Sequence, residues 1–219
     1  MREAGPKLGL TFDVEWWPFQ LDPTLPKEGV DKLEHYRRKF GEFRVNTMVP
    51  RMKQVGRAHG LEFNYGGRVS NTLDSHRLQL WAERTGGRPK ADALREILFR
   101  TYFKDNGDIG DAATLAAAAR EAGLEGAEDF LATDDLLDVT VRLAEQKRRE
   151  YGVNGVPFFV LDNRVAFSGA QDAKTIVHIM EQIVKPEGDA ADDDDGGDGD
   201  DGGAAGRAAG AARGGASGL

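Results

Sequence analysis

The pattern of apolar and polar residues predicts strands near both ends of the folded part of the chain. Over residues 10–17 apolar side chains occupy every even position and are separated by Thr, Asp and Glu. This period of two predicts a strand with one apolar face. Residues 158–161 and 164–167 are rich in Phe, Val and Leu, and Asp162-Asn163 separates them. They predict two antiparallel strands joined by a tight turn.

Between these strands the apolar residues recur at helical spacing, which predicts a series of amphipathic helices. One of them is expected to begin near Val49, with Thr47 as its N-cap and Pro50 in its first turn. Glycines mark several of the expected helix ends, because Gly suits a left-handed C-cap. The expected helices span residues 30–40, 49–60, 73–86 and 89–103, a segment from Asp111 or Thr114 to Ala122, a segment from Asp134 or Asp135 to Glu150, and a last helix capped by Asp172.

Charge is distributed unevenly along the 219 residues. The formal net charge is -8. Residues 186–219 contain nine acidic residues and two arginines, so they carry -7 of this charge, and the preceding residues are close to neutral. This segment consists mostly of Gly, Ala and Asp and has no large apolar side chain before the terminal Leu219. We expect it to be a disordered acidic tail, because it cannot bury enough apolar surface to offset the entropy lost on ordering.

The sequence gives no reason to expect cysteine chemistry, a metal or cofactor site, a membrane span or a signal peptide. The chain has no cysteine, so it can form no disulfide, thiolate metal site or cysteine nucleophile of its own. Its four histidines lie in separate segments without the spacing of metal ligands, and no cofactor motif is present, so no metal site and no cofactor are expected. No apolar run approaches the roughly 18 residues of a membrane span, and no signal peptide is evident. A cytoplasmic protein that binds neither membrane nor nucleic acid is expected.

Two places could carry a binding function. Pro157 opens the first strand of the expected hairpin, where an X-Pro bond can be cis, although a trans bond is the commoner case. Asn71 and His76 lie at the expected start of a helix. They could face a cleft, although residues at such positions are more often an N-terminal cap and a packed or exposed histidine.

Three stretches resemble the DsbA family of thioredoxin-fold thiol-disulfide oxidoreductases, most closely its cytoplasmic FrnE-like branch. They are WWPFQLDPTLPKEG at 16–29, SNTLDSHRL at 70–78 and YGVNGVPFFVLDNRVAFSGAQ at 151–171. The chain also resembles the related 2-hydroxychromene-2-carboxylate isomerases and kappa-class glutathione transferases. The resemblance implies an α/β, thioredoxin-like fold in a domain of residues 1–185. An inserted α-helical subdomain is expected over about 45–150, and the tail over 186–219.

The resemblance also implies where a substrate would bind. It makes the Val156-Pro157 bond a cis-proline beside the family's active site, where the unpaired backbone before the proline can bond an extended polypeptide by strand addition. If the ligand is instead a small thiol such as glutathione, Asn71, His76 and Gln171 are expected near it.

The chain departs from the family because the family's C-x-x-C helix has no counterpart in it. The segment at 10–17 corresponds to the family's second strand, so the first strand and the active-site helix are expected upstream of Met1, and no catalytic residue is assigned. Three hypotheses follow. In the first hypothesis the chain is an incomplete product of a gene for an ordinary oxidoreductase. In the second it is a redox-inactive module that binds peptides in the manner of a chaperone. In the third hypothesis it is a glutathione-dependent isomerase or transferase relative.

Overall fold

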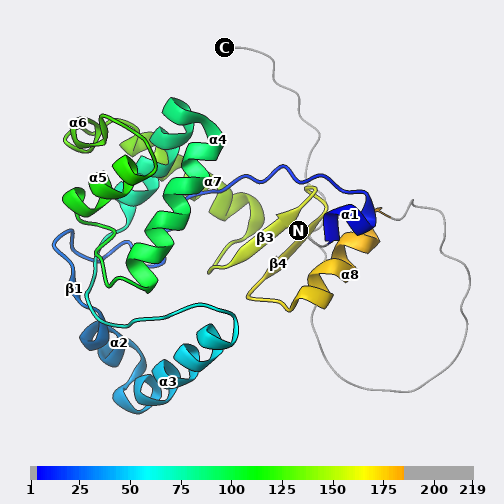
Figure 1. Ribbon diagram of the computed structural model, residues 1–219, viewed down its shortest axis with the longest axis horizontal. Coiled ribbons are helices and arrows are strands. Elements are labelled where there is room, and N and C mark those ends of the chain that lie inside the picture. The colour runs from blue at the N-terminus through cyan, green and yellow to red at the C-terminus, as the bar shows by residue number, and fades with distance from the viewer. Residues whose placement is uncertain (1–3, 185–219) are drawn as a thin grey trace, which may run out of the picture. The chain divides into compact units, whose positions relative to one another are not determined.

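The computed structural model describes residues 4–184, which divide into two compact units (Figure 1). The smaller unit consists of residues 4–15 and 153–184, and the larger unit of residues 16–152. The acidic segment at 186–219, for which disorder is expected, lies outside the described residues.

The smaller unit is built on the predicted hairpin. Strands β3 (Phe158–Leu161) and β4 (Val165–Ser168) pair antiparallel, with Phe159 opposite Phe167. Asp162 and Asn163, in the turn, both have positive φ, 52° and 51°. Short polar residues tolerate this left-handed conformation, and the N–H of Arg164 donates to the carbonyl of Leu161 at 3.0 Å. Because Leu161 pairs with Val165, the connection has three residues, one more than predicted. The structure therefore confirms the hairpin and the place of its turn.

Two helices complete the smaller unit. Helix α8 (Ala173–Val184) begins where predicted, because Asp172 accepts a hydrogen bond from the backbone N–H of Thr175 at 2.9 Å. Its inward side includes the buried Met180. The short helix α1 (Ala4–Leu8) contacts α8.

The strand predicted over residues 10–17 is wrong. Residues 10–20 have no regular secondary structure, and Phe12, Val14 and Trp16 are each more than a third exposed. Alternating apolar residues indicate only which side of an extended segment could be buried. A strand also needs a neighbouring strand to complete its hydrogen-bond ladder, and in the described part of the chain β3 pairs only with β4.

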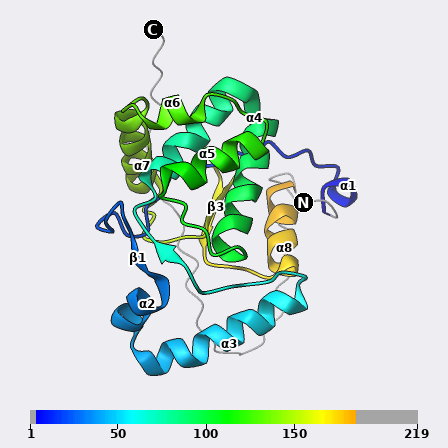
Figure 2. The same ribbon diagram turned by 60° about the vertical axis from the view of Figure 1, so that its left-hand side comes forward.

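The larger unit is predominantly helical. A two-residue antiparallel bridge joins β1 (Val30–Asp31) to β2 (Arg68–Val69). The helices are α2 (Lys32–Phe40), α3 (Glu42–Ala58), α4 (Leu73–Phe103), α5 (Ala112–Glu121), α6 (Ala127–Leu131) and α7 (Leu137–Tyr151). Figure 2 shows α2 and α3 as neighbouring helices, and among the helices and strands of its own unit α3 packs mainly against α2.

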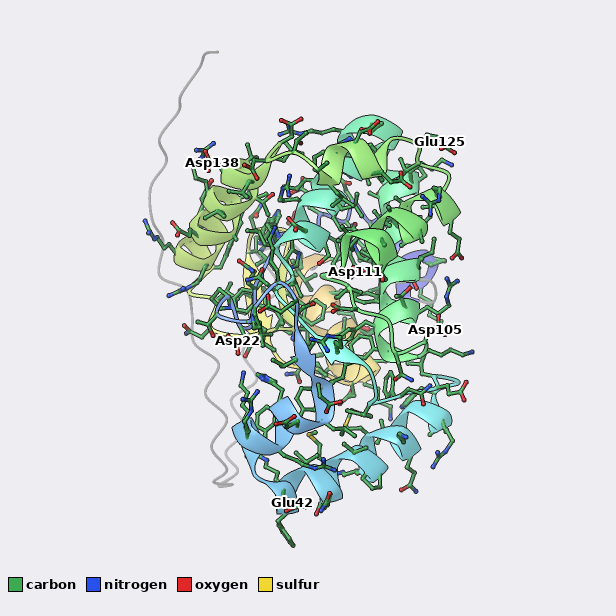
Figure 3. The ribbon with its side chains drawn as sticks, turned by 90° about the vertical axis from the view of Figure 1, so that its left-hand side faces the viewer. Asp22, Glu42, Asp105, Asp111, Glu125 and Asp138 are labelled. Atoms are coloured by element: carbon green, nitrogen blue, oxygen red, sulfur yellow. The ribbon has the colours of Figure 1, made fainter. Side chains whose placement is uncertain are left out.

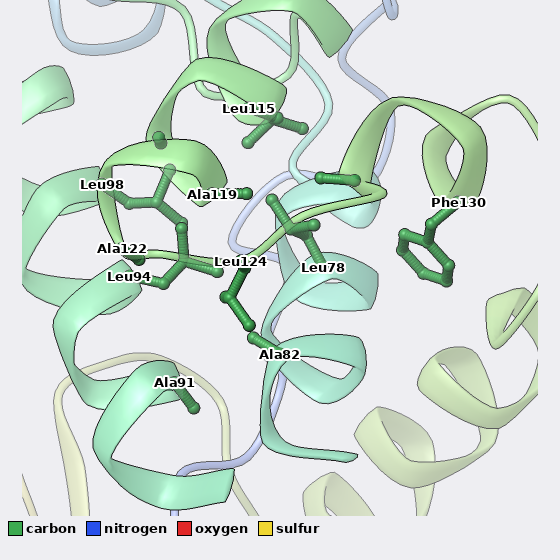
Figure 4. Close-up of a cluster of buried hydrophobic side chains, with 12 residues drawn as sticks. Leu78, Ala82, Ala91, Leu94, Leu98, Leu115, Ala119, Ala122, Leu124 and Phe130 are labelled. Atoms are coloured by element: carbon green, nitrogen blue, oxygen red, sulfur yellow. The ribbon is translucent and has the colours of Figure 1, made fainter. Parts of the chain in front are cut away.

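The core of the larger unit lies between α4, α5 and α6 (Figure 4). Helix α4 bends at Gly87, whose φ of 73° and ψ of 176° are not helical, so the predicted boundary at Gly86-Gly87 is confirmed as a kink. The kink lets both halves of α4 pack against α5. Alanines of α5, including Ala119, allow a close approach, and Leu78, Leu94 and Leu115 fill the space between the helices.

In the larger unit two predicted helix starts are wrong, and that of α5 is confirmed. Helix α3 begins at Glu42, so Pro50 lies in its interior and Thr47 bonds the carbonyl of Phe43 instead of capping the helix. Val45 is buried, and this burial favours a helix ahead of Pro50 despite the lost backbone donor. By contrast, Asp111 caps α5 as predicted, because it accepts from the N–H of Thr114.

The second wrong start is that of α7. It begins at Leu137 behind Leu136, which is left-handed at φ 62°, and neither Asp134 nor Asp135 caps it with a side chain. The buried Arg77 instead donates hydrogen bonds to carbonyls of the preceding loop. The short helix α6 was not predicted, because five residues are too few to show a periodic pattern.

We predict that Leu94→Ala destabilises the larger unit. Leu94 is fully buried, so the substitution removes methyl groups and leaves a cavity, at a cost of about 2–5 kcal/mol in the free energy of unfolding. Urea denaturation measures this cost. Leu21→Ala is the matched control, because Leu21 is 67% exposed. An equal loss in both variants would contradict the assigned core.

Candidate functional site

The predicted site residues of the smaller unit lie at the open end of the hairpin. The Val156-Pro157 peptide bond is cis, the isomer that the family resemblance implies. The carbonyl of Pro157 accepts a hydrogen bond from the N–H of Gly169 at 2.8 Å, which extends the hairpin ladder by one pair. Val156 lies outside the ladder and is 51% exposed. The backbone of Val156 is thus without a hydrogen-bond partner within residues 4–184.

One edge of β3 is also open within the described residues. In an antiparallel pair, alternate residues direct their N–H and C=O groups toward the partner strand, and the others direct them away. Because Pro157 bonds toward β4, Phe158 and Val160 direct their backbone groups to the opposite edge. β3 pairs only with β4 in the part of the chain that the structure describes. The outward backbone groups of Phe158 and Val160 therefore have no partner strand among the described residues.

The surroundings of this edge are partly apolar. The rings of Phe159 and Phe167 stack with centroids 5.1 Å apart, and Phe159 is partly exposed. Gln171 lies just beyond the hairpin, where its side-chain amide donates to the carbonyl of Ser168 at 3.1 Å. Gln171 is exposed, so its amide oxygen remains accessible. The site combines backbone hydrogen-bonding groups with a small aromatic surface.

Asn71 and His76 belong to the larger unit, at the start of α4. The side chain of Asn71 accepts from Gln20 at 2.8 Å and from the backbone N–H of Leu73 at 3.0 Å. It also donates to the carbonyl of Pro23 at 3.0 Å. These bonds occupy both ends of the Asn71 amide. They attach the extended segment around residues 20–23 to the first turn of α4.

His76 extends this attachment. Its Nε2 lies 3.1 Å from the carbonyl oxygen of Phe19, so the ring donates its proton there. Burial lowers the pKa of His76 to about 4, although the Phe19 carbonyl favours the protonated ring. The imidazole is therefore neutral near pH 7. Its contacts describe an anchor for the extended segment, and the structure places it in a different unit from Val156.

A buried arginine next to this anchor was not among the predicted site residues. Arg77 is 1% exposed and donates to Asp74 at 2.6 Å and to the carbonyls of Thr133 and Asp135. Burial raises the pKa of Asp74, but hydrogen bonds from Arg77 and Lys27 outweigh it and hold that pKa below the usual value. The i,i+3 spacing of Asp74 and Arg77 was the available sequence signal.

Lys32 is a second buried charge that sequence reasoning missed. Its Nζ donates to the carbonyl of Tyr102 at 3.1 Å and lies 3.8 Å above that residue's ring. Burial lowers the pKa of Lys32, and the nearby Asp108 opposes this shift. Burial also raises the pKa of Tyr102 well above its ordinary value. These contacts fix the start of α2 against the end of α4 and leave the amine enclosed.

The described residues offer no metal site, since no group of three or more His, Asp or Glu side chains could hold an ion there. Figure 3 shows labelled carboxylates on separate elements of the larger unit, including Asp22, Glu42 and Asp138. With no cysteine in the sequence, the 219 residues supply no thiolate. Among residues 4–184, none of the helices has both the length and the apolar character that crossing a membrane requires.

Comparison with models of protein families gives a match. A family model described as DSBA-like thioredoxin domain matches residues 7–181, which is most of the chain. The comparison with curated proteins found no match.

We predict that His76 makes stability depend on pH. The folded-state pKa of about 4 lies below the ordinary value of 6.5, so the unfolded chain binds more protons between these values. The contribution of His76 to the free energy of unfolding is therefore complete above pH 6.5. It falls as the pH decreases toward 4, by roughly 2–3 kcal/mol at most.

Urea midpoints measured from pH 7.5 to pH 4 test this dependence. His76→Gln serves as the reference, because Gln keeps a side-chain donor but does not titrate. Carboxylates contribute equally to both proteins, so the stability difference isolates His76. Parallel pH profiles for the two proteins would refute the prediction.

Proposed function

The chain belongs to the DSBA-like thioredoxin domain family, and from this premise we propose that it binds extended polypeptide segments beside Val156-Pro157. The family relationship is to thiol-disulfide oxidoreductases. Binding of an unfolded segment is the part of that activity that the present residues can perform. The unpaired backbone of Val156, a residue that is 51% exposed, is the observation that carries the proposal.

The physical basis is strand addition. An extended peptide can exchange backbone hydrogen bonds with Val156 and with the open edge at Phe158 and Val160. Such bonds depend on the peptide backbone and not on its side chains, so the site would accept many sequences. The exposed Phe159 adds an apolar contact, which favours segments that are normally buried.

Thiol chemistry is not assigned to these residues. Disulfide exchange requires a thiolate that attacks a disulfide sulfur, and the 219 residues contain no cysteine. Any such exchange would need a thiol from outside them. Within the family we propose the FrnE-like branch, on the three stretches at 16–29, 70–78 and 151–171, and with it a cytoplasmic location. The first strand and C-x-x-C helix of that branch are not among these residues.

Glutathione is the alternative ligand of the same backbone. It is a small thiol with peptide bonds, so it too could bond Val156. Asn71 and His76 already bond the segment around residues 19–23, which leaves them less suited to a ligand. An extended polypeptide uses more of the open edge, and we favour it for that reason.

We predict that Val156→Pro weakens peptide binding by up to about tenfold, because it removes one backbone donor worth about 0.5–1.5 kcal/mol. Val156→Ala is the matched control, since it keeps the N–H and shortens only the side chain. Fluorescence anisotropy with a labelled, reduced and carboxymethylated polypeptide measures both affinities without any thiol.

Urea unfolding of each variant checks that the fold is kept. If Val156→Pro folds and binds as tightly as Val156→Ala, the backbone of Val156 is not part of the site. If the parent chain fails to bind the polypeptide but binds glutathione in a calorimetric titration, the alternative ligand replaces the proposed one.

A further inference from the structure

Positive and negative charge are separated within the larger unit. Residues 32–60, which include α2 and α3, contain eight Lys and Arg residues and two Glu, a net charge of +6. The other residues of 16–152 contain 14 basic and 20 acidic residues, a net charge of -6. A local excess of positive charge creates a potential that attracts polyanions. The net charge of the whole chain, which disfavours a nucleic-acid partner, conceals this basic region.

Basic residues and aromatic rings alternate at the corner where α2 ends and α3 begins. Residues 37–44 read RRKFGEFR, with four basic residues, two phenylalanines and one acid. Phe43 is 88% exposed and Phe40 is 40% exposed, so both rings reach the surface. Gly41, whose φ of 83° is not helical, separates the two helices here. Figure 3 labels Glu42 at this corner.

Helix α3 continues the basic region beyond the corner. Its buried residues Val45 and Gly56 mark the side that packs on the rest of the unit. Arg44 and Arg51 are exposed and turned away from that side. Their separation of seven residues is close to two helical turns, so they lie on one side of α3, about 10 Å apart along its axis. No acidic residue occurs over 43–61 to offset them.

The arginines of this region have no counter-charge in the part of the chain that the structure describes. Of the charged side chains in residues 32–60, only Lys39 forms an ion pair there, with Asp22 at 3.8 Å. An unpaired, exposed guanidinium group can bind a phosphate through two hydrogen bonds at once. We call the exposed basic and aromatic residues of this region the basic surface, and they are Arg37, Arg38, Phe40, Phe43, Arg44 and Arg51.

We propose that the basic surface binds single-stranded RNA. Charge alone would suit any polyanion, but the exposed rings favour one that carries planar groups. Every base has a face that can stack on an aromatic side chain, and this face is accessible only where the base is unpaired. Phe43 offers such a stacking partner directly beside the guanidinium group of Arg44. This binding is independent of the proposed peptide site, which belongs to the smaller unit.

Polar side chains on the same side of α3 favour RNA over DNA. Thr47 and Gln54 each follow one of the arginines by three residues, so they share its side of the helix, and both are exposed. The hydroxyl of Thr47 donates to the carbonyl of Phe43 at 3.0 Å and can still accept a hydrogen bond. The 2′-hydroxyl of RNA both donates and accepts, and DNA lacks it.

These contacts predict binding that depends on salt and tolerates many sequences. Contacts to phosphates carry no sequence information, and stacking is possible with every base. On a single strand, each neutralised phosphate contributes about -0.7 to the slope of the logarithm of the binding constant against that of the salt concentration. Four arginines on phosphates therefore predict a slope of about -3.

Fluorescence anisotropy with labelled oligouridylate RNA tests the proposal on the full chain. A probe of about 12 nucleotides falls within the range of known single-strand site sizes. A triple variant of the basic surface should weaken binding at low salt and make the salt slope shallower by about 2. This variant combines Arg38→Gln, Arg44→Gln and Arg51→Gln.

The matched control removes the same charge from exposed arginines elsewhere in the larger unit and should keep the slope of the parent. It combines Arg84→Gln, Arg142→Gln and Arg148→Gln. Phe43→Ala should weaken binding at least about fivefold without changing the salt slope, because it removes a stacking face and no charge. Phe43→Tyr keeps the aromatic face and should bind as the parent does.

Urea unfolding of each variant checks that the fold is kept. The proposal is overturned if the two triple variants bind the probe equally, or if Phe43→Ala binds as tightly as Phe43→Tyr. The duplex of the probe with oligoadenylate should bind more weakly, and equal affinity would refute stacking on unpaired bases. Equal or tighter binding of the corresponding oligothymidylate DNA would refute the preference for RNA. Tighter binding of polyglutamate would assign the surface to an acidic polypeptide instead.

Discussion

The guanidinium group of Arg77 is the interaction on which the larger unit most depends. It is buried, so its charge must be compensated locally, and it obtains this from the Asp74 carboxylate and two loop carbonyls. It also lies 5.2 Å from the centre of the Phe130 ring, which stacks on Trp81. One side chain of α4 thereby fixes α6 and the loop that leads into α7. Removing it would leave Asp74 with only the partly exposed Lys27 as a partner, and the carbonyls of Thr133 and Asp135 without this donor, which is more costly than losing a fully exposed pair.

The same interaction explains an error in the sequence-based prediction. Asp134 and Asp135 are good N-cap residues by type, but Arg77 holds the loop by its backbone carbonyls. Helix α7 then starts directly after Leu136. The backbone of Leu136 is left-handed, a conformation that is unfavourable for a bulky residue. Local preference was overridden by a contact across 58 residues. Features that local chemistry decides were predicted correctly, such as the turn at Asp162-Asn163.

In the candidate site, too, features that local chemistry decides could be predicted from the sequence, and features that depend on distant contacts could not. The mouth of the hairpin at Val156-Pro157 could be located from the sequence, because a proline before an apolar strand marks where a ladder begins. The roles of Asn71 and His76 could not, because their partners lie some 50 residues away in a segment without regular structure. The failed strand at 10–17 has a related cause. Periodicity reveals a potential face but not whether a neighbouring strand exists to complete the ladder.

If the chain binds peptides as proposed, the absence of a thiol limits how long a peptide stays bound. An oxidoreductase can trap its substrate in a mixed disulfide, whereas the present residues offer only backbone hydrogen bonds and an aromatic contact at the edge of β3. Each such bond contributes a small net free energy in water. Retention must therefore come from several bonds along an extended segment. A folded protein exposes few unpaired strand edges, so the proposed binding would favour unfolded chains through backbone availability.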